Sequence, residues 1–151
     1  MLETKTSFED FCGVVQPKLR QAFAARYGYT DGAEATAEAL AYAWEHWERV
    51  RGMENAAGYL YRVGRSKTRR IRRATPLLVD MPERGIPHVE PGLPAALASL
   101  SENQRVAVIL VAGFGWKLRE VAELRGVSTS TVQNHLERGM KKLRTSMGEP
   151  S

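Results

Sequence analysis

The sequence predicts an all-α protein of two small helical domains joined by a proline-rich linker. Apolar residues recur at helical spacing on both sides of the chain's middle, and no segment alternates apolar and polar residues over a useful strand length. Five of the seven prolines fall between positions 76 and 94. Because proline fixes φ and lacks a backbone donor, residues 75–92 can form neither a regular helix nor a central strand.

The charge distribution follows the same division. The 151 residues carry a formal net charge of +5, and their 43% apolar and 26% charged content is close to the globular average. Residues 1–73 hold 13 Lys and Arg against 9 acids, residues 74–93 hold 1 against 3, and residues 94–151 hold 8 against 5. Two basic domains around an acidic joint favour nucleic-acid-binding units on a tether. We expect the two domains to need a partner before they are ordered relative to each other.

The first two helices carry recognisable start signals. Ser7 with Asp10 predicts the start of the first helix, Pro17 is expected to kink it and Gly28 to end it. Asp31 with Glu34 predicts the start of the second. One face of that helix is apolar, and the opposite face carries carboxylates: Leu40, Ala43, Trp44, Trp47 and Val50 on the first, and Glu34, Glu38, Glu45 and Glu48 on the second. We expect Trp44 in the core, and Trp47 either in the core or as a stacking surface.

A third helix is predicted from about Asn55. Residues 62–73 contain seven basic side chains and no acidic one, with Arg62, Arg65 and Arg69 on the side opposite the apolar residues. Like charges at this spacing repel one another, so a stripe of one sign indicates an anionic partner. Arginines can neutralise phosphates, and Trp47, Tyr59 and Tyr61 are candidate surfaces for base stacking.

The second domain contains a pattern typical of a helix-turn-helix. Ser101 is predicted to cap a helix that reaches about Phe114, and residues 118–143 then give two short helices around a turn. Ala122 is small where the helices meet, Gly126 lies at the turn, and Ser128 is placed to cap the second helix. The side chains predicted to meet DNA from that second helix are Ser128, Ser130, Thr131, Gln133, Asn134, Glu137, Arg138 and Lys141. Asn and Gln can pair with adenine and Arg with guanine in the major groove, while Lys141, Lys142 and Arg144 suit phosphates.

The chain resembles a known family over about four fifths of its length. Residues 94–144, through Leu97 to Arg105, Gly115 and the helix-turn-helix, resemble region 4 of sigma-70-type RNA polymerase sigma factors. Residues 8–73 resemble region 2, through the phrases at 33–44 and 57–65. The short chain with only these two regions is similar to the extracytoplasmic-function (ECF) subfamily. The resemblance implies a three-to-four-helix region 2 bundle and a four-helix region 4 domain.

The same resemblance implies roles for individual residues. Docking on the β′ clamp of core RNA polymerase is assigned to Glu34, Glu38, Leu40 and Glu45. Recognition and melting of the promoter −10 element are assigned to Arg49, Arg51, Asn55, Tyr59, Arg62, Arg65, Ser66 and Arg69. The second helix of the helix-turn-helix would read the −35 element. Further implied partners are the polymerase β flap and, in some members, an anti-sigma factor.

Other classes of function find little support in the sequence. The single cysteine, Cys12, forms no intrachain disulfide, and three distant histidines make a metal site improbable. No catalytic set, cofactor loop, signal peptide or membrane-spanning run is visible, so we expect a cytoplasmic, non-enzymatic protein without cofactor, metal, membrane or small-molecule substrate. The alternative is a free-standing helix-turn-helix transcriptional regulator, which has no need for an acidic docking helix beside a basic one.

Overall fold

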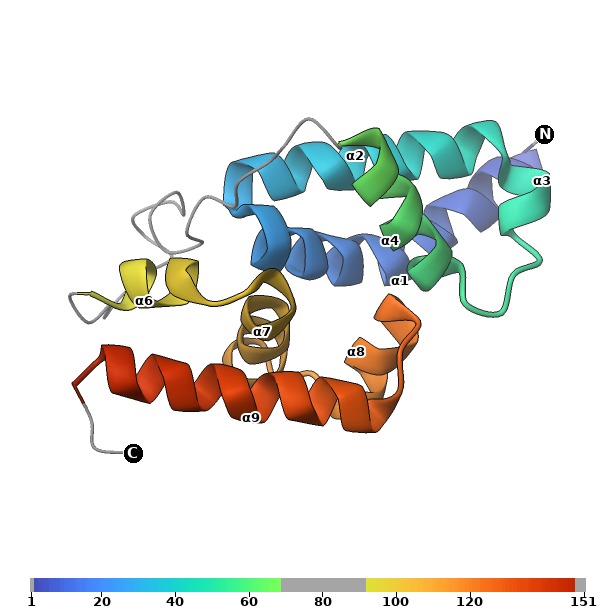
Figure 1. Ribbon diagram of the computed structural model, residues 1–151. Helices are drawn as coiled ribbons and strands as arrows, with labels where there is room; N and C mark the ends of the chain where they lie inside the picture. Colours follow the sequence, from blue (N-terminus) through green and yellow to red (C-terminus); the bar gives the residue numbers. More distant parts are fainter. Residues whose placement is uncertain (1, 69–91, 149–151) are drawn as a thin grey trace.

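The computed structural model describes residues 2–68 and 92–148, and within these ranges every regular element is a helix (Figure 1). The first unit consists of α1 (Leu2–Tyr27), α2 (Tyr29–Glu45), α3 (Trp47–Val50) and α4 (Ala56–Lys67). The second consists of α6 (Leu93–Ser99), α7 (Glu102–Ala107), the π-helical segment η2 (Val108–Gly113), α8 (Leu118–Arg125) and α9 (Thr129–Ser146). The predicted all-α class is confirmed.

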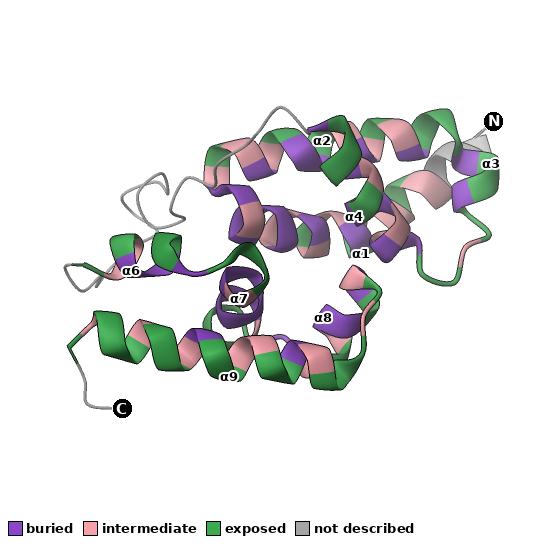
Figure 2. Cartoon of the chain, in the orientation of Figure 1, coloured by how far each residue is buried: buried purple, intermediate pink, exposed green. Residues whose placement is uncertain are grey.

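The first unit is built around the pair α1 and α2, with α4 packed across both. Leu19, Phe23, Leu60 and Tyr61 are fully buried between these helices, and the rings of Phe23 and Tyr61 stack with centroids 5.0 Å apart. Burial of large apolar side chains is the main source of stability in a unit of this size. Figure 2 shows the buried residues gathered on the inward sides of the helices. This packing fixes the outer faces of α2 and α4 relative to each other.

Two predicted helix starts in this unit are wrong. α1 begins at Leu2 and not at Ser7, because residues 2–6 include good helix formers and the helix starts before the capping signal. α2 begins at Tyr29, directly after Gly28, whose φ of 94° turns the chain. Asp31 therefore lies in the first turn of α2, where its negative charge complements the helix dipole. The predicted end of the first helix at Gly28 is confirmed.

The acidic and apolar stripes do not run along one uninterrupted helix. α2 ends at Glu45, and His46, with φ −119° and ψ 32°, separates it from the short helix α3. Trp44 is 50% exposed and rests on Phe8, 5.0 Å between ring centroids, so the expectation that it lies in the core is wrong. Trp47 is buried and packs against Phe8 and Phe11, and the open choice for this residue is decided in favour of the core.

The second unit follows its sequence signals closely. The hydroxyl of Ser101 accepts a hydrogen bond from the Gln104 amide, and the Gln104 side chain accepts one from the Ser101 amide, which forms a complete capping box at α7. α7 continues into η2, which ends at Gly113, close to the predicted limit at Phe114. α9 packs on α7, η2 and α8.

The two units pack against each other, which differs from the expectation of two domains without a fixed relative orientation. α1 contacts α7 and η2, and α4 contacts α8, as the ribbon shows (Figure 1). Apolar residues of both units belong to one continuous buried cluster, which includes Leu19 and Leu60 from the first and Leu110 and Leu124 from the second. The predicted linker, residues 74–93, lies outside the described residues except for Gly92 and Leu93, and α6 already begins at Leu93. Among the described helices, none has the length and hydropathy needed to cross a bilayer.

Candidate nucleic-acid interface

The helix-turn-helix is formed by α8 and α9. Gly126 has φ +71° and ψ 36°, a left-handed conformation that side chains disfavour, and its amide donates to the carbonyl of Ala122 at 2.8 Å. The hydroxyl of Ser128 accepts a hydrogen bond from the Thr131 amide at 3.1 Å and caps α9. Val132 packs the start of α9 into the core. The turn at Gly126 and the cap at Ser128 were predicted from the sequence, and both are confirmed.

The outward face of α9 presents the residues that were predicted to read DNA bases. The exposed members of the set are Ser128, Ser130, Gln133, Asn134, Glu137, Arg138 and Lys141, and Thr131 is half-buried. The amide of Gln133 donates to the carboxylate of Glu137 at 3.1 Å, so these two side chains lie together as one polar pair. Ser128 precedes α9 as its cap, and the other six exposed side chains are on α9 itself, a helix long enough to cross a major groove.

His135 lies behind this face and contacts the turn of the motif. Its Nδ1 is 3.3 Å from a guanidinium nitrogen of Arg125. The pKa of His135 is lowered first by burial and then by the positive charges of Arg125 and Arg138. A neutral imidazole at this position avoids adding a third positive charge beside two guanidinium groups.

The basic face of α4 is on the surface wherever it is described. Asn55 caps the helix by accepting a hydrogen bond from the Gly58 amide at 3.1 Å. Arg62, Arg65 and Ser66 are exposed, whereas the opposite side of α4 is buried against the core. Arg69 lies outside the described residues. The described part of the stripe is therefore accessible to a polyanion.

Sequence reasoning missed one member of this region, Tyr42. Its hydroxyl lies 2.8 Å from that of Tyr59, and Arg49 donates to both hydroxyls, at 2.7 Å to Tyr59. The ring of His46 stacks on Tyr42 with centroids 4.1 Å apart, and the Lys67 ammonium lies 5.8 Å from the centroid of the Tyr42 ring. The hydrogen bond with Tyr59 is the largest cause of the raised pKa of Tyr42. Residues 42 and 49 lie on either side of the break at His46, and Tyr59 is on α4, so no local pattern in the sequence indicated this group.

Two of the predicted stacking surfaces are corrected by the structure. Tyr61 is fully buried, and its phenol contributes to the core beside Phe23. Trp47 is 6% exposed, so neither ring can accept a nucleobase without unfolding the core. Tyr59 is half-buried and keeps an accessible edge held by Arg49. Arg49 and Arg51 are both exposed, and Arg51 pairs with Glu48 at 3.7 Å.

The acidic side chains predicted to dock on polymerase lie on the outer face of α2. Glu34 and Glu45 are exposed, whereas Glu38 and Leu40 are half-buried. These carboxylates are on α2 and the exposed arginines are on α4, so one unit carries charges of each sign on two different helices. Within the described residues, no group of three or more His, Cys, Asp or Glu side chains is arranged to hold a metal ion.

The fold and these surfaces define a class of protein: a two-unit helical protein with an exposed basic helix in one unit and a helix-turn-helix in the other. Residues 92–143, about a third of the chain, match the family described as sigma-70, region 4. The sequence is 35% identical over 68 residues to the RNA polymerase sigma factor CarQ of Myxococcus xanthus. That stretch is 45% of this chain and 39% of CarQ, so the chain matches about two fifths of the length of its curated relative.

A solved structure extends the similarity in fold to nearly the whole chain. It is the co-crystal structure of the sigma factor RpoE with the anti-sigma factor NepR from Bartonella quintana, with a TM-score of 0.68 at 19% identity. The superposition covers 93% of this chain and 96% of that one. The resemblance to sigma-70-type sigma factors is therefore confirmed, and the structural match adds a shared all-helical fold that includes the first unit.

Proposed function

We propose that this chain is a sigma factor of the ECF type, which binds core RNA polymerase and directs it to promoters by recognising −10 and −35 elements. One observation carries the proposal: an exposed recognition helix in a region 4 domain is joined to a second unit with an exposed single-sign basic helix. A free-standing regulator would need only the first of these surfaces. The two surfaces together suit a protein that holds two stretches of the same DNA.

We assign the −35 element to α9 and the −10 element to α4 with the loop before it. Arg62 and Arg65 would neutralise phosphates of the melted strand, and the edge of Tyr59, held by Tyr42 and Arg49, would contact an unstacked base. Arg138 is the best placed side chain of α9 to reach a guanine, because it is exposed and planar with several donors.

The polymerase contacts would come from other surfaces. The carboxylates of α2 suit a basic partner such as the β′ clamp. In the second unit, an apolar groove of about 270 Å³ suits the β flap, and it is lined by Leu93, Leu97, Val108, Ile109, Ala112, Gly113 and Leu143. No step in this function requires a cofactor or catalysis by the chain itself. The neighbour of known structure was crystallised with an anti-sigma factor, and we propose that a similar protein regulates this chain in the cytoplasm.

The decisive experiment is run-off transcription from genomic fragments with purified core polymerase. We expect transcripts with defined start sites that depend on the chain, together with capture of core polymerase in a pull-down. Glu34→Lys with Glu45→Lys should abolish capture, whereas Glu9→Lys, an exposed charge on α1, should not. Binding to duplex DNA without any affinity for core polymerase would instead identify a free-standing regulator.

A further inference from the structure

The rotation of α9 about its own axis is fixed by contacts on its inner side. Val132 is fully buried there. Gly139, on the same face two turns later, is also buried, and it lies so close to η2 that a Cβ built on it would be 2.7 Å from Cγ2 of Val108. These two points hold the inner face against the domain, and they leave Gln133 and Glu137 exposed at a fixed angle.

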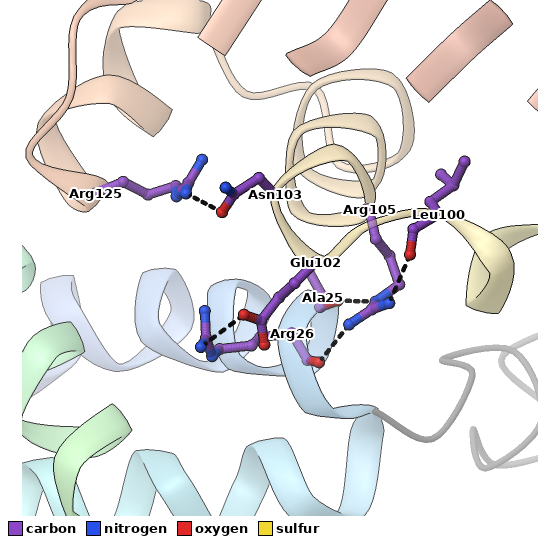
Figure 3. Close-up of polar contacts among 7 residues, drawn as sticks. All are labelled: Ala25, Arg26, Leu100, Glu102, Asn103, Arg105 and Arg125. Carbon is purple, nitrogen blue, oxygen red and sulfur yellow. Dashed lines mark hydrogen bonds and ion pairs between the residues drawn. The ribbon is translucent and has the colours of Figure 1, made fainter. Parts of the chain in front are cut away.

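A polar bridge from the preceding helix supports the same orientation. Arg125, at the end of α8, donates to the side-chain oxygen of Asn103 on α7 (Figure 3). Another of its guanidinium nitrogens lies 3.3 Å from Nδ1 of His135 on α9. A planar guanidinium has several donors in a rigid arrangement, so it can hold two partners in fixed positions. Arg125 therefore joins three helices of the second unit and is a positioning residue for the outward face of α9.

The hydrogen bond between Gln133 and Glu137 decides which way the Gln133 amide is turned. The NH2 group of Gln133 donates to Oε1 of Glu137 at 3.1 Å. A carboxylate only accepts hydrogen bonds, so the amide oxygen of Gln133 cannot take the place of the NH2 group. The two residues are one turn apart on α9, and both are exposed. The amide oxygen of Gln133 and the second carboxylate oxygen of Glu137 therefore remain as acceptors for an outside partner.

The bases differ in what they offer to such acceptors in the major groove. Adenine and cytosine each present an exocyclic amino group, which donates hydrogen bonds. Guanine presents O6 and N7 and thymine presents O4, and all of these atoms only accept. Two acceptors facing guanine or thymine form no hydrogen bond and meet partial charge of their own sign. A glutamine without a fixed partner could turn its amide to suit either kind of base.

We propose that Gln133 and Glu137 act as one acceptor unit, which selects an amino base, adenine or cytosine, at one position of the −35 element and rejects guanine and thymine there. This specificity rests on the proposed function, because it requires α9 to lie in the major groove. Gln133 contacts the base, and Glu137 holds the amide in the selecting orientation. A carboxylate near DNA phosphates weakens binding, so its presence on this face is best explained by the rejection of wrong bases.

Glu137→Gln removes the constraint and keeps the size of the side chain. An amide at position 137 can donate as well as accept, so Gln133 is free to turn its NH2 group outward. At the selected position, the wild type should prefer adenine or cytosine over guanine or thymine about tenfold, and Glu137→Gln should lower this ratio to about twofold. Glu9→Gln makes the same chemical change at an exposed position of α1 and should keep the wild-type ratio.

A promoter library measures this ratio in the complete transcription complex. The library is built on a fragment that the run-off assay identifies, is randomised across the −35 element, and carries a barcode in each transcript. Each variant is tested with core polymerase, and the transcripts are sequenced. If Glu137 only stabilised the helix, Glu137→Gln would lower transcription from all templates alike and leave the ratio unchanged. That result, or a wild type without preference for an amino base at any position, would overturn the proposal.

Nuclear magnetic resonance of the full chain tests the hydrogen bond without polymerase or DNA. We expect one NH2 proton of Gln133 to resonate downfield of its ordinary position in the wild type and in Glu9→Gln, and to return to that position in Glu137→Gln. Identical Gln133 signals in all three proteins would refute the fixed amide, whatever the chain does in transcription. If the hydrogen bond is present but no template is transcribed, the proposed function fails and the −35 specificity falls with it. Transcription without amino-base selection overturns the inference alone.

Discussion

Replacing Gly64 by alanine tests how tightly the basic helix is held against the core. Gly64 lies on the buried side of α4, between the exposed Arg62 and Arg65. A Cβ built at this position would lie 2.2 Å from Cζ of Phe23 and 2.9 Å from its Cε2. Such contacts are well below van der Waals distance, so the ring or the helix must move.

The magnitude follows from how little the ring can move. Phe23 is fully buried and stacks on Tyr61, at 5.0 Å, and on Tyr27, at 6.1 Å. Overpacking of a core costs about 1–3 kcal/mol, and the rigid aromatic stack places this site near the upper end. The higher helix propensity of alanine offsets about 1 kcal/mol. We expect a net loss of about 2 kcal/mol in the free energy of unfolding.

Gly13→Ala is the matched control. Gly13 lies in the interior of α1 and is exposed, and a Cβ built there meets no atom within 4 Å. The same substitution should therefore stabilise the protein by about 1 kcal/mol through helix propensity alone. The two variants should differ by about 3 kcal/mol, or about 6–12 °C in melting temperature at ~2–4 °C per kcal/mol. Thermal melts followed by circular dichroism measure this difference, and a Gly64→Ala variant as stable as Gly13→Ala would refute the packing argument.

Four other predictions concern the DNA-binding surfaces. Ser128→Ala removes the cap of α9 and should lower the free energy of unfolding by about 1 kcal/mol in urea titrations, while Ser128→Asp should retain most of it. Arg62→Ala with Arg65→Ala should weaken open-complex formation. The slope of the log binding constant against the log salt concentration should become shallower by about 0.7–0.9 per lost phosphate contact, and an unchanged slope would exclude phosphate contacts by these arginines. Arg138→Ala should relax the −35 preference by about 1–3 kcal/mol in competition assays, whereas equal losses on every sequence would mean a backbone contact only. Because the pKa of His135 is lowered in the folded state, the unfolded state binds a proton on this imidazole more readily. His135 therefore contributes stability above about pH 6.5, and this contribution is lost as the pH falls towards the folded pKa. His135→Gln should flatten the pH dependence of the melting temperature in that window.

The elements that could be predicted are those fixed by contacts between near neighbours in sequence. The caps at Ser101, Ser128 and Asn55 each bond an amide three residues away, and Gly126 satisfies a carbonyl four residues back. Hydrogen bonds of this range depend on the residue type and its immediate context, so the sequence is sufficient to locate them. The exposed face of α9 follows from the same local periodicity.

Periodicity alone could not assign depth of burial in the first unit. Trp44 and Tyr61 both lie in amphipathic patterns, yet one is half exposed and the other is fully buried. The difference depends on which part of α1 lies against each ring. Phe8, near the amino-terminal end of α1, leaves Trp44 half exposed, whereas Phe23 stacks on Tyr61 in the core. The role of Tyr42 was hidden for the same reason, because its partner Tyr59 is on another helix.

The sequence by itself determined the helical class, the helix-turn-helix with its caps and turn, and the single-sign charge of α4, because each depends on residues within one or two turns of each other. Only the tertiary structure decided that the two units close on each other. From the sequence alone, the side chain of Arg105 could be exposed or buried. Its burial is decided by the carboxyl-terminal end of α1, whose carbonyls accept its hydrogen bonds. Contacts made across some 80 residues depend on how whole helices are arranged, and no local pattern records that arrangement.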